Sequence, residues 1–377
     1  MSTALFDTYV MVDWSAESRP KRGADSIWLA RLQRCADGTL AATEPVNPPT
    51  RAAASALLEA LLDAELAARR RVLLGFDFPF GYPEGFAARL GLSGPAWRAI
   101  WQDFTLLVKD DAANSNNRFA VAEQLNWRVS GSSFPFWGRP SGADFPMLAP
   151  HHHRRHAAEG LAERRLVDQR VRRSQPAWKL LGIGSAGSQA LTGIPVLERL
   201  KQRFGGDLQV WPFETGLTAP TAPAIVLAEI YPSLFPIDPA LGEVKDAVQT
   251  CTTARVFAEQ DTVGELARLF AGDPDLTEAE RAVVVVEEGW VLGVTGPINK
   301  KPARRAGVPP AGGRDACPTS QSDVSSGGPN SLPRGAIAQT SQTPSPPHGG
   351  GEGGAPSFPK SSSAGWGRQA WDAGTSV

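Results

Sequence analysis

The 377-residue chain has little of several features that would assign it to a protein class. Its three cysteines, Cys35, Cys251 and Cys317, are too few and too scattered for a disulfide framework or a Cys-rich zinc site. No apolar run approaches the roughly 18 residues that a membrane span needs, and the N-terminus lacks the basic and then apolar pattern of a signal peptide. We therefore expect a cytoplasmic protein that does not enter a membrane.

An excess of charge of one sign is also missing, because 38 Lys and Arg residues face 39 Asp and Glu residues. This balance excludes a chain that coats nucleic acid as a polycation, so any basic surface must be local. Apolar residues become scarce only after Lys300, where Gly, Pro and Ser dominate. Such a composition cannot bury enough apolar surface to offset the entropy of ordering. We expect a folded domain over residues 1–297 and a disordered tail over 298–377.

The first 80 residues predict three strands, a helix and a fourth strand. Residues 8–12 are mainly apolar, residues 26–33 alternate, and a weaker strand ends at Pro48. Thr50 is placed to cap a helix that extends to about residue 70, with leucines at helical spacing. Residues 72–77, VLLGFD, form a short continuous apolar run, which is typical of a strand covered on both faces.

The part from about residue 82 to 190 is rich in Trp, Pro, Asn and Arg and lacks clear strands, so we interpret it as a helical insertion. A helix that stops at Gly205 and Gly206 follows, then strands at 208–214 and 224–232 and a helix at 243–260. Residues 282–294 close the domain as a helix end, a hairpin or both. This alternation predicts an α/β fold with a mixed sheet flanked by helices.

Acidic residues stand at the ends of predicted strands. In α/β sheets, sites form outside the carboxyl ends of the strands, and a fourth acid lies in the first turn of the late helix, beside its apolar face. Converging acids repel one another unless a divalent cation lies among them, and oxygen ligands suit Mg²⁺ or Mn²⁺. The pattern predicts a catalytic metal site that consists of Asp13, Asp77, Glu229 and Asp246.

Each acid also has a simpler interpretation when it is taken alone. An aspartate after a strand, such as Asp13, commonly forms a turn or caps a helix. Asp246 could be a solvated acid that the helix dipole favours. Asp77 and Glu229 are followed within three residues by prolines rather than by helix starts, which disfavours capping at those two positions. The four acids together favour a shared site.

Four short blocks, taken in their order along the chain, resemble the ribonuclease H-like superfamily and, within it, the DUF429 family of predicted nucleases. The blocks are VDWSA, GFDFPFGYP, AEIYPSLF and VKDAVQT, at residues 12–16, 75–83, 228–235 and 244–250. The chain departs from the family pattern in its long insertion and at Gln249, where a further acid often follows Asp-Ala. The resemblance implies a ribonuclease H-like fold.

The resemblance also implies a reaction, namely two-metal hydrolysis of phosphodiester bonds. In the family's arrangement Asp13 would bridge both cations. Asp77 and Glu229 would hold one cation each, and Asp246 would complete the ligand set. Lys245, beside Asp246, could face a phosphate or solvent, and we expect solvent.

Candidate substrate contacts lie at a helix start in the insertion and in the glycine-rich loop after it. The asparagines before that helix could bind a phosphate or a base edge, although an asparagine at a helix start needs no ligand. Residues 182–187, GIGSAG, match the GxGxxG pattern of dinucleotide sites but lack a good strand before them. The loop could hold a phosphate or only let two helices pack. The candidates are Asn117, Arg118, Ser185, Ser188 and Gln189.

Three functions remain open at this point. The first is a metal-dependent nuclease or phosphodiesterase. The second is a non-catalytic accessory protein on the same fold that binds a nucleotide or a protein, since a fold does not fix a function. The third is a protein of cofactor biosynthesis that uses the glycine-rich loop. Arginines at 154–173 could steer a nucleic-acid backbone, so nucleic acid or a nucleotide is the expected partner.

Overall fold

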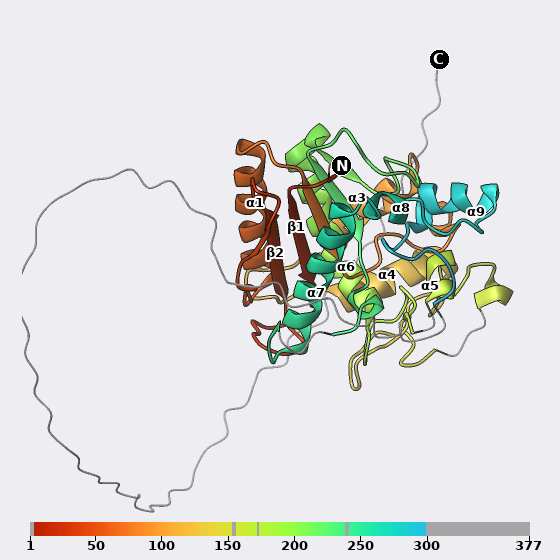
Figure 1. Cartoon of the computed structure of the whole chain (residues 1–377). Coiled ribbons are helices and arrows are strands. Elements are labelled where there is room, and N and C mark those ends of the chain that lie inside the picture. Colours follow the sequence, from red (N-terminus) through yellow and green to blue (C-terminus); the bar gives the residue numbers. More distant parts are fainter. Residues whose placement is uncertain (1–3, 153–155, 172, 238–240, 299–377) are drawn as a thin grey trace, which may run out of the picture. The chain divides into compact units, whose positions relative to one another are not determined.

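A computed structural model describes residues 4–152, 156–171, 173–237 and 241–298 (Figure 1). Its centre is a six-stranded sheet in the order β3-β2-β1-β4-β6-β5. β2 is antiparallel to β1 and β3, whereas β1, β4, β6 and β5 are parallel. The predicted α/β class with a mixed sheet is confirmed. The strands are Thr8–Asp13 (β1), Trp28–Arg34 (β2), Leu40–Ala42 (β3), Val72–Phe76 (β4), Leu208–Val210 (β5) and Ile225–Glu229 (β6).

Helices cover both faces of this sheet. α1 packs its leucines against Val10 and Val12 on one face, and α3, α4 and α6 extend the same core. α7 lies against β1 and β2 on the other face (Figure 1), where Phe257 and Met11 belong to a second core. The helices are Arg51–Ala67 (α1), Phe86–Arg89 (α2), Ala96–Leu107 (α3), Arg118–Ser130 (α4), Leu166–Arg170 (α5), Ala186–Phe204 (α6), Lys245–Thr262 (α7), Leu266–Leu269 (α8) and Glu278–Val283 (α9).

β1 is the strand that positions the acids. Its residues Tyr9 to Val12 are fully buried, because helices cover both faces of the sheet at this point. Val10 and Val12 belong to the core beneath α1, and Tyr9 and Met11 to the core beneath α7. Since side chains alternate along a strand, Asp13 leaves β1 on the α7 side.

The predicted helical insertion contains α2, α3, α4 and α5, but more than half of residues 82–190 lie outside helices. Its aromatic side chains extend the core beneath α1. Tyr82 contacts Phe86, Phe104, Phe136 and Trp178, with ring centroids 4.9–5.9 Å apart. All five rings are buried. These aromatic residues therefore stabilise the fold and are not available to stack on a base.

The start of the insertion packs closely on the end of the domain. Residues Val284–Glu288 form a π-helical turn, and Gly81 lies directly on it. A β-carbon at Gly81 would come within 2.1 Å of the Glu287 carbonyl oxygen. Only glycine permits this approach.

We expect Gly81→Ala to lower the free energy of unfolding by about 1–3 kcal/mol or more, because the added methyl group forces backbone apart. The matched control is Gly206→Ala, where nothing lies within 4 Å of the added carbon. Urea denaturation of the two variants measures the difference. Equal stabilities would contradict the close contact.

The predicted tail begins where the described residues end. Ile298 is its one described residue, and its N–H group donates to the Arg170 carbonyl oxygen at 2.8 Å. Residues 299–377, with Cys317, lie outside the described part, and so do residues 153–155 of the arginine-rich stretch.

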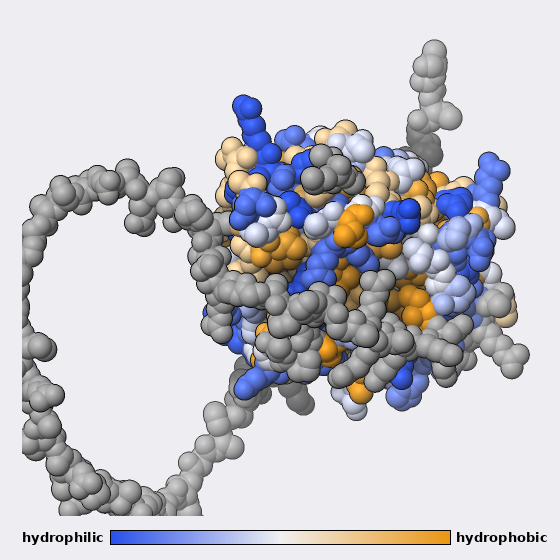
Figure 2. Space-filling view, in the orientation of Figure 1, coloured by the Kyte–Doolittle hydropathy of each residue, from blue (hydrophilic) through white to orange (hydrophobic). Residues whose placement is uncertain are grey.

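Figure 2 shows hydrophilic and hydrophobic residues interspersed on the visible face of the protein. Within the described ranges, none of the helices combines the length and the apolar character that crossing a bilayer requires.

Candidate carboxylate site

Asp13 and Asp77 meet at the carboxyl ends of two adjacent strands. β1 and β4 are parallel, and Val12 lies opposite Phe76. The next residues, Asp13 and Asp77, therefore leave the two strands at the same level. The two carboxyl groups hydrogen-bond to each other. Asp77 Oδ1 also accepts the N–H of Trp14 at 2.7 Å, which fixes its carboxyl group against the residue that follows Asp13.

Asp246 reaches the same place from α7. It lies in the first turn of that helix, as predicted, and its Oδ2 accepts the N–H of Asp25 at 2.7 Å. Its negative charge acts on both Asp13 and Asp77. Three carboxylates from β1, β4 and α7 therefore share one site.

The pKa values of the pair show how crowded this site is. Burial raises the pKa of Asp13 well above its usual range, and the charges of Asp77 and Asp246 raise it further. Burial also raises the pKa of Asp77 to about 7, although the hydrogen bond from Trp14 opposes the rise. Like charges this close cannot both ionise freely, so the pair holds a proton near neutral pH. The Lys245 side chain is exposed, as expected, yet its charge lowers the pKa of Asp13.

Glu229 has partners of its own. It pairs with Phe76 across β4 and β6, one residue before Asp77, so its side chain leaves the opposite face of the sheet. Both of its carboxylate oxygens accept from Arg165 at 2.7 Å, and Oε2 also accepts the N–H of Phe80 at 3.0 Å. The structure thus brings three of the four predicted acids together and pairs Glu229 with a buried arginine.

Arg165 is the centre of this second, fully buried polar group. It pairs with Asp168 at 3.1 Å as well as with Glu229, and it donates to the carbonyl oxygen of Glu288. The two carboxylates raise the pKa of Arg165 against the effect of burial. No local sequence pattern indicates this pair, because Arg165 lies in the insertion and its partner Glu229 lies on β6.

Three of the five candidate substrate contacts adjoin the loop after Asp13. Arg118 Nη1 donates to Ser18 Oγ at 2.8 Å, and its Nε donates to Ser188 Oγ at 3.0 Å. Gln189 Nε2 donates to the Trp14 carbonyl oxygen at 2.6 Å. Gln189 therefore holds the residue after Asp13, Arg118 holds Ser18, and Ser188 supports Arg118.

The other two candidates have local roles. Asn117 Oδ1 accepts the N–H of Lys109, and its Nδ2 donates to the Leu107 carbonyl oxygen, so it closes the polar loop. Ser185 stands before α6 without a capping bond from its side chain. The N–H of Gly187 already donates to the Lys179 carbonyl oxygen at 2.9 Å, which leaves this loop less able to cradle a phosphate.

Arg51 also holds the loop after Asp13, and sequence reasoning missed it. It is buried at the start of α1, donates through two nitrogens to Asp110, and donates through Nη1 to the carbonyl oxygens of Ser15 and Glu17. An arginine in the first turn of an amphipathic helix carries no sequence signal for such a role.

Arg118 differs from Arg51 in having no direct ion pair among the described residues. It is only 9 % exposed, and its hydrogen-bond partners are neutral hydroxyl and amide oxygens. Among the described residues, no carboxylate lies within 4.0 Å of its guanidinium group. Burial and the nearby charge of Arg51 lower its pKa to about 10, although the charges of Glu17 and Asp110 oppose the shift. A buried cation without a paired anion is costly, so the site favours an added anion beside Ser18.

The donor set of the three aspartates suits a hard divalent cation. Carboxylate oxygens are the ligands that Mg²⁺ and Mn²⁺ take, and no described Lys, Arg or His forms an ion pair with these three acids. In the arrangement described, no group of three His, Cys, Asp or Glu side chains is already placed around a metal position.

The raised pKa of Asp77 predicts a pH dependence of stability. Its value of about 7 exceeds the 3.8 of an unfolded aspartate, so between these values the folded chain binds more protons. The stabilising contribution of the protonated Asp77 to the free energy of unfolding is complete below about pH 4. It is lost as the pH rises through about 7.

Urea denaturation in EDTA at pH 5 and pH 8 measures this effect when the wild type is compared with Asp77→Asn. The stability of the wild type relative to the variant should fall with rising pH, and Mg²⁺ should restore it at pH 8 by binding the ionised pair. A pH-independent difference would contradict the shared proton.

The chain's own residues are the basis for a functional assignment. Comparison with protein-family models, with curated proteins and with solved structures gave no match. The features that bear on function are the three aspartates, the loop that starts at Asp13, and the buried Arg118.

Proposed function

We propose that the protein is a divalent-cation-dependent hydrolase of phosphodiester bonds, with Asp13, Asp77 and Asp246 as cation ligands. One observation carries the proposal: three carboxylates meet at the strand ends, two of them share a proton, and no basic side chain is paired with them among the described residues. Such a group is unfavourable by itself. A divalent cation would replace the proton and remove the repulsion.

The order of elements supports a ribonuclease H-like assignment. The resemblance implies three strands, a helix and an acid-ended fourth strand, followed by a further acid on a late helix. β1, β2, β3, α1 and β4 follow in that order, and Asp246 lies on α7. Adjacent parallel strands β1 and β4 place the first two acids at one edge, where α/β sheets form their sites.

The ligand set is smaller than the resemblance implies. Glu229 would have to leave Arg165 before it could hold a second cation, and that would leave a buried arginine partly unpaired. We therefore assign Glu229 to the fold and the three aspartates to the cation. When bound, the cation would supply an activated water and stabilise the leaving oxygen.

Arg118 gives the proposal its substrate class. It is a buried cation with neutral partners, and it holds Ser18 on the loop that begins at Asp13. An arginine in this position suits a phosphate, because its planar group donates several hydrogen bonds to one anion. We infer that Arg118 binds a phosphate of the substrate beside the carboxylates.

Cleavage assays on single-stranded DNA, single-stranded RNA and a nitrophenyl phosphodiester, each with Mn²⁺ or with EDTA, test the function. We expect cleavage only with the cation. Arg118→Gln should raise KM about tenfold or more with a smaller change in kcat, since it removes binding to the phosphate.

The matched control is Arg203→Gln, which removes an arginine that pairs with Asp63 at the surface. It should leave both constants unchanged. If none of the three substrates were cleaved with Mn²⁺, the proposal that the protein is a hydrolase would be wrong. If Mn²⁺ still bound, a non-catalytic binding protein on this fold would be the better account.

A further inference from the structure

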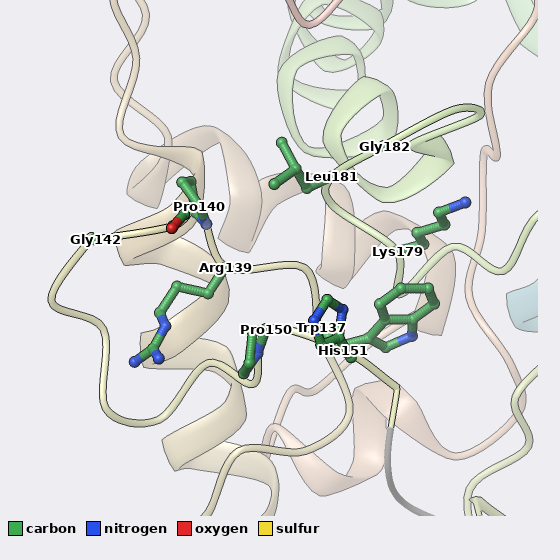
Figure 3. A pocket seen from close by; sticks show the side chains of 10 residues that line it. Trp137, Arg139, Pro140, Gly142, Pro150, His151, Lys179, Leu181 and Gly182 are labelled. Atoms are coloured by element: carbon green, nitrogen blue, oxygen red, sulfur yellow. The ribbon is translucent and has the colours of Figure 1, made fainter.

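A pocket of about 550 Å³ opens in the insertion, on segments that the carboxylate site does not use. Its lining includes Trp137, Arg139, Pro140, His151, Lys179 and Leu181. In Figure 3 Leu181 lies on one side of the pocket and His151 and Trp137 on the opposite side, while the charged ends of Arg139 and Lys179 point outward at its rim. The volume lies within the range of about 300–1,000 Å³ that small-molecule sites have.

Backbone hydrogen bonds fix the walls of this pocket. Trp137 forms isolated β-bridges with Ala149 and with Lys179, which join three segments of the insertion. Gly138 has a φ of +106°, and a β-carbon there would lie 2.7 Å from the Leu181 backbone nitrogen. The close approach of these two segments therefore depends on this glycine.

The lining is basic and contains no acid. Arg139, His151 and Lys179 contribute to it, and neither Asp nor Glu does. Lys179 Nζ donates to the Gln175 side chain and to the Ile183 carbonyl oxygen, and Arg139 donates to the Phe145 carbonyl oxygen. Neither cation has a carboxylate within 4.0 Å among the described residues. The pocket therefore attracts an anion.

Apart from Ser141 and two glycines, the remaining lining is apolar. Leu181 is 44 % exposed, Trp137 is partly exposed, and two prolines complete the walls. Lys179 Nζ lies 5.9 Å from the centre of the Trp137 ring. An aromatic ring with a nearby cation is a surface on which a nucleobase stacks.

We propose that this pocket binds a nucleotide, with the base against Trp137 and Leu181 and the phosphate toward Arg139. The ligand needs both parts, because the apolar walls give no affinity to a bare anion and the cations give none to an uncharged base. The same chemistry is present in a free mononucleotide and at the end of a single strand. This pocket is separate from the site of the three aspartates, and binding in it requires no divalent metal ion.

Calorimetry on the full chain in EDTA tests the site with AMP, adenosine, inorganic phosphate and a short single-stranded oligoadenylate. We expect AMP or the oligoadenylate to bind about tenfold or more tightly than adenosine and phosphate. Binding of AMP identifies a free nucleotide as the ligand, and binding of the oligoadenylate alone identifies a strand end.

Arg139→Glu and Leu181→Asp should each weaken this binding about tenfold or more, whereas Arg268→Glu, an exposed arginine on α8, should not. Both pocket positions are at least partly exposed, and unchanged thermal unfolding would show that each variant folds. Asp13→Asn should leave nucleotide binding intact, which separates this proposal from the hydrolase. Absence of binding at millimolar nucleotide, or equal affinity in the pocket variants, would overturn it.

Discussion

Arg165→Met should lower the free energy of unfolding by about 3–5 kcal/mol. The substitution keeps the length of the side chain but removes the charge, and it leaves Glu229 and Asp168 buried without their partner. An uncompensated buried carboxylate is among the largest single costs in a folded protein. Chemical denaturation with two spectroscopic probes measures the loss.

A second substitution separates this effect from lost packing. Arg165→Met with Glu229→Gln should recover part of the stability, because the unpaired charge of Glu229 is gone. Arg268→Met is the surface control and should change stability by less than about 0.5 kcal/mol. If Arg165→Met were as stable as the wild type, Glu229 would be free to act elsewhere, and its assignment to the fold would be wrong.

Asp13→Asn should reduce phosphodiester hydrolysis on the order of 10³-fold, which corresponds to about 4 kcal/mol of transition-state stabilisation. The reason is that Asp13 is the acid that hydrogen-bonds Asp77 and also feels the charge of Asp246. An amide at position 13 would remove one ligand of the cation and weaken its binding by Asp77 and Asp246. Initial rates at saturating Mn²⁺ measure the loss.

The same variant should not be less stable than the wild type in EDTA. Removing one of three clustered carboxylates relieves their repulsion, and sites built for function commonly gain stability when a functional group is lost. Asp63→Asn, at an exposed acid on α1, serves as the control for the chemical change alone. A large loss of stability in Asp13→Asn would indicate that the acid has a structural role.

The sequence predicted the elements of this site better than their orientation. Apolar runs and the Thr50 cap placed β1, α1 and β4, and Thr50 does accept the N–H of Ala53. Asp246 in the first turn of α7 also follows from helix periodicity. These features depend on residues close together in the chain, and local patterns report them.

Register and long-range pairing could not be predicted in the same way. Glu229 ends β6 just as Asp13 ends β1, yet it pairs with Phe76 and so faces the other side of the sheet. A strand that shifts by one residue exchanges its two faces, and no local pattern fixes that shift. The partner that neutralises Glu229 lies in an insertion whose path the sequence leaves open.

Calorimetric titration of Mn²⁺ into the wild type, Asp13→Asn and Glu229→Gln tests the central claim, that three aspartates and not Glu229 hold a cation. We expect the wild type to bind Mn²⁺, Asp13→Asn to bind it at least about tenfold more weakly, and Glu229→Gln to keep its affinity wherever thermal unfolding shows it folded. Absence of Mn²⁺ binding to the wild type, or affinity that survives in Asp13→Asn and disappears in Glu229→Gln, would contradict the account.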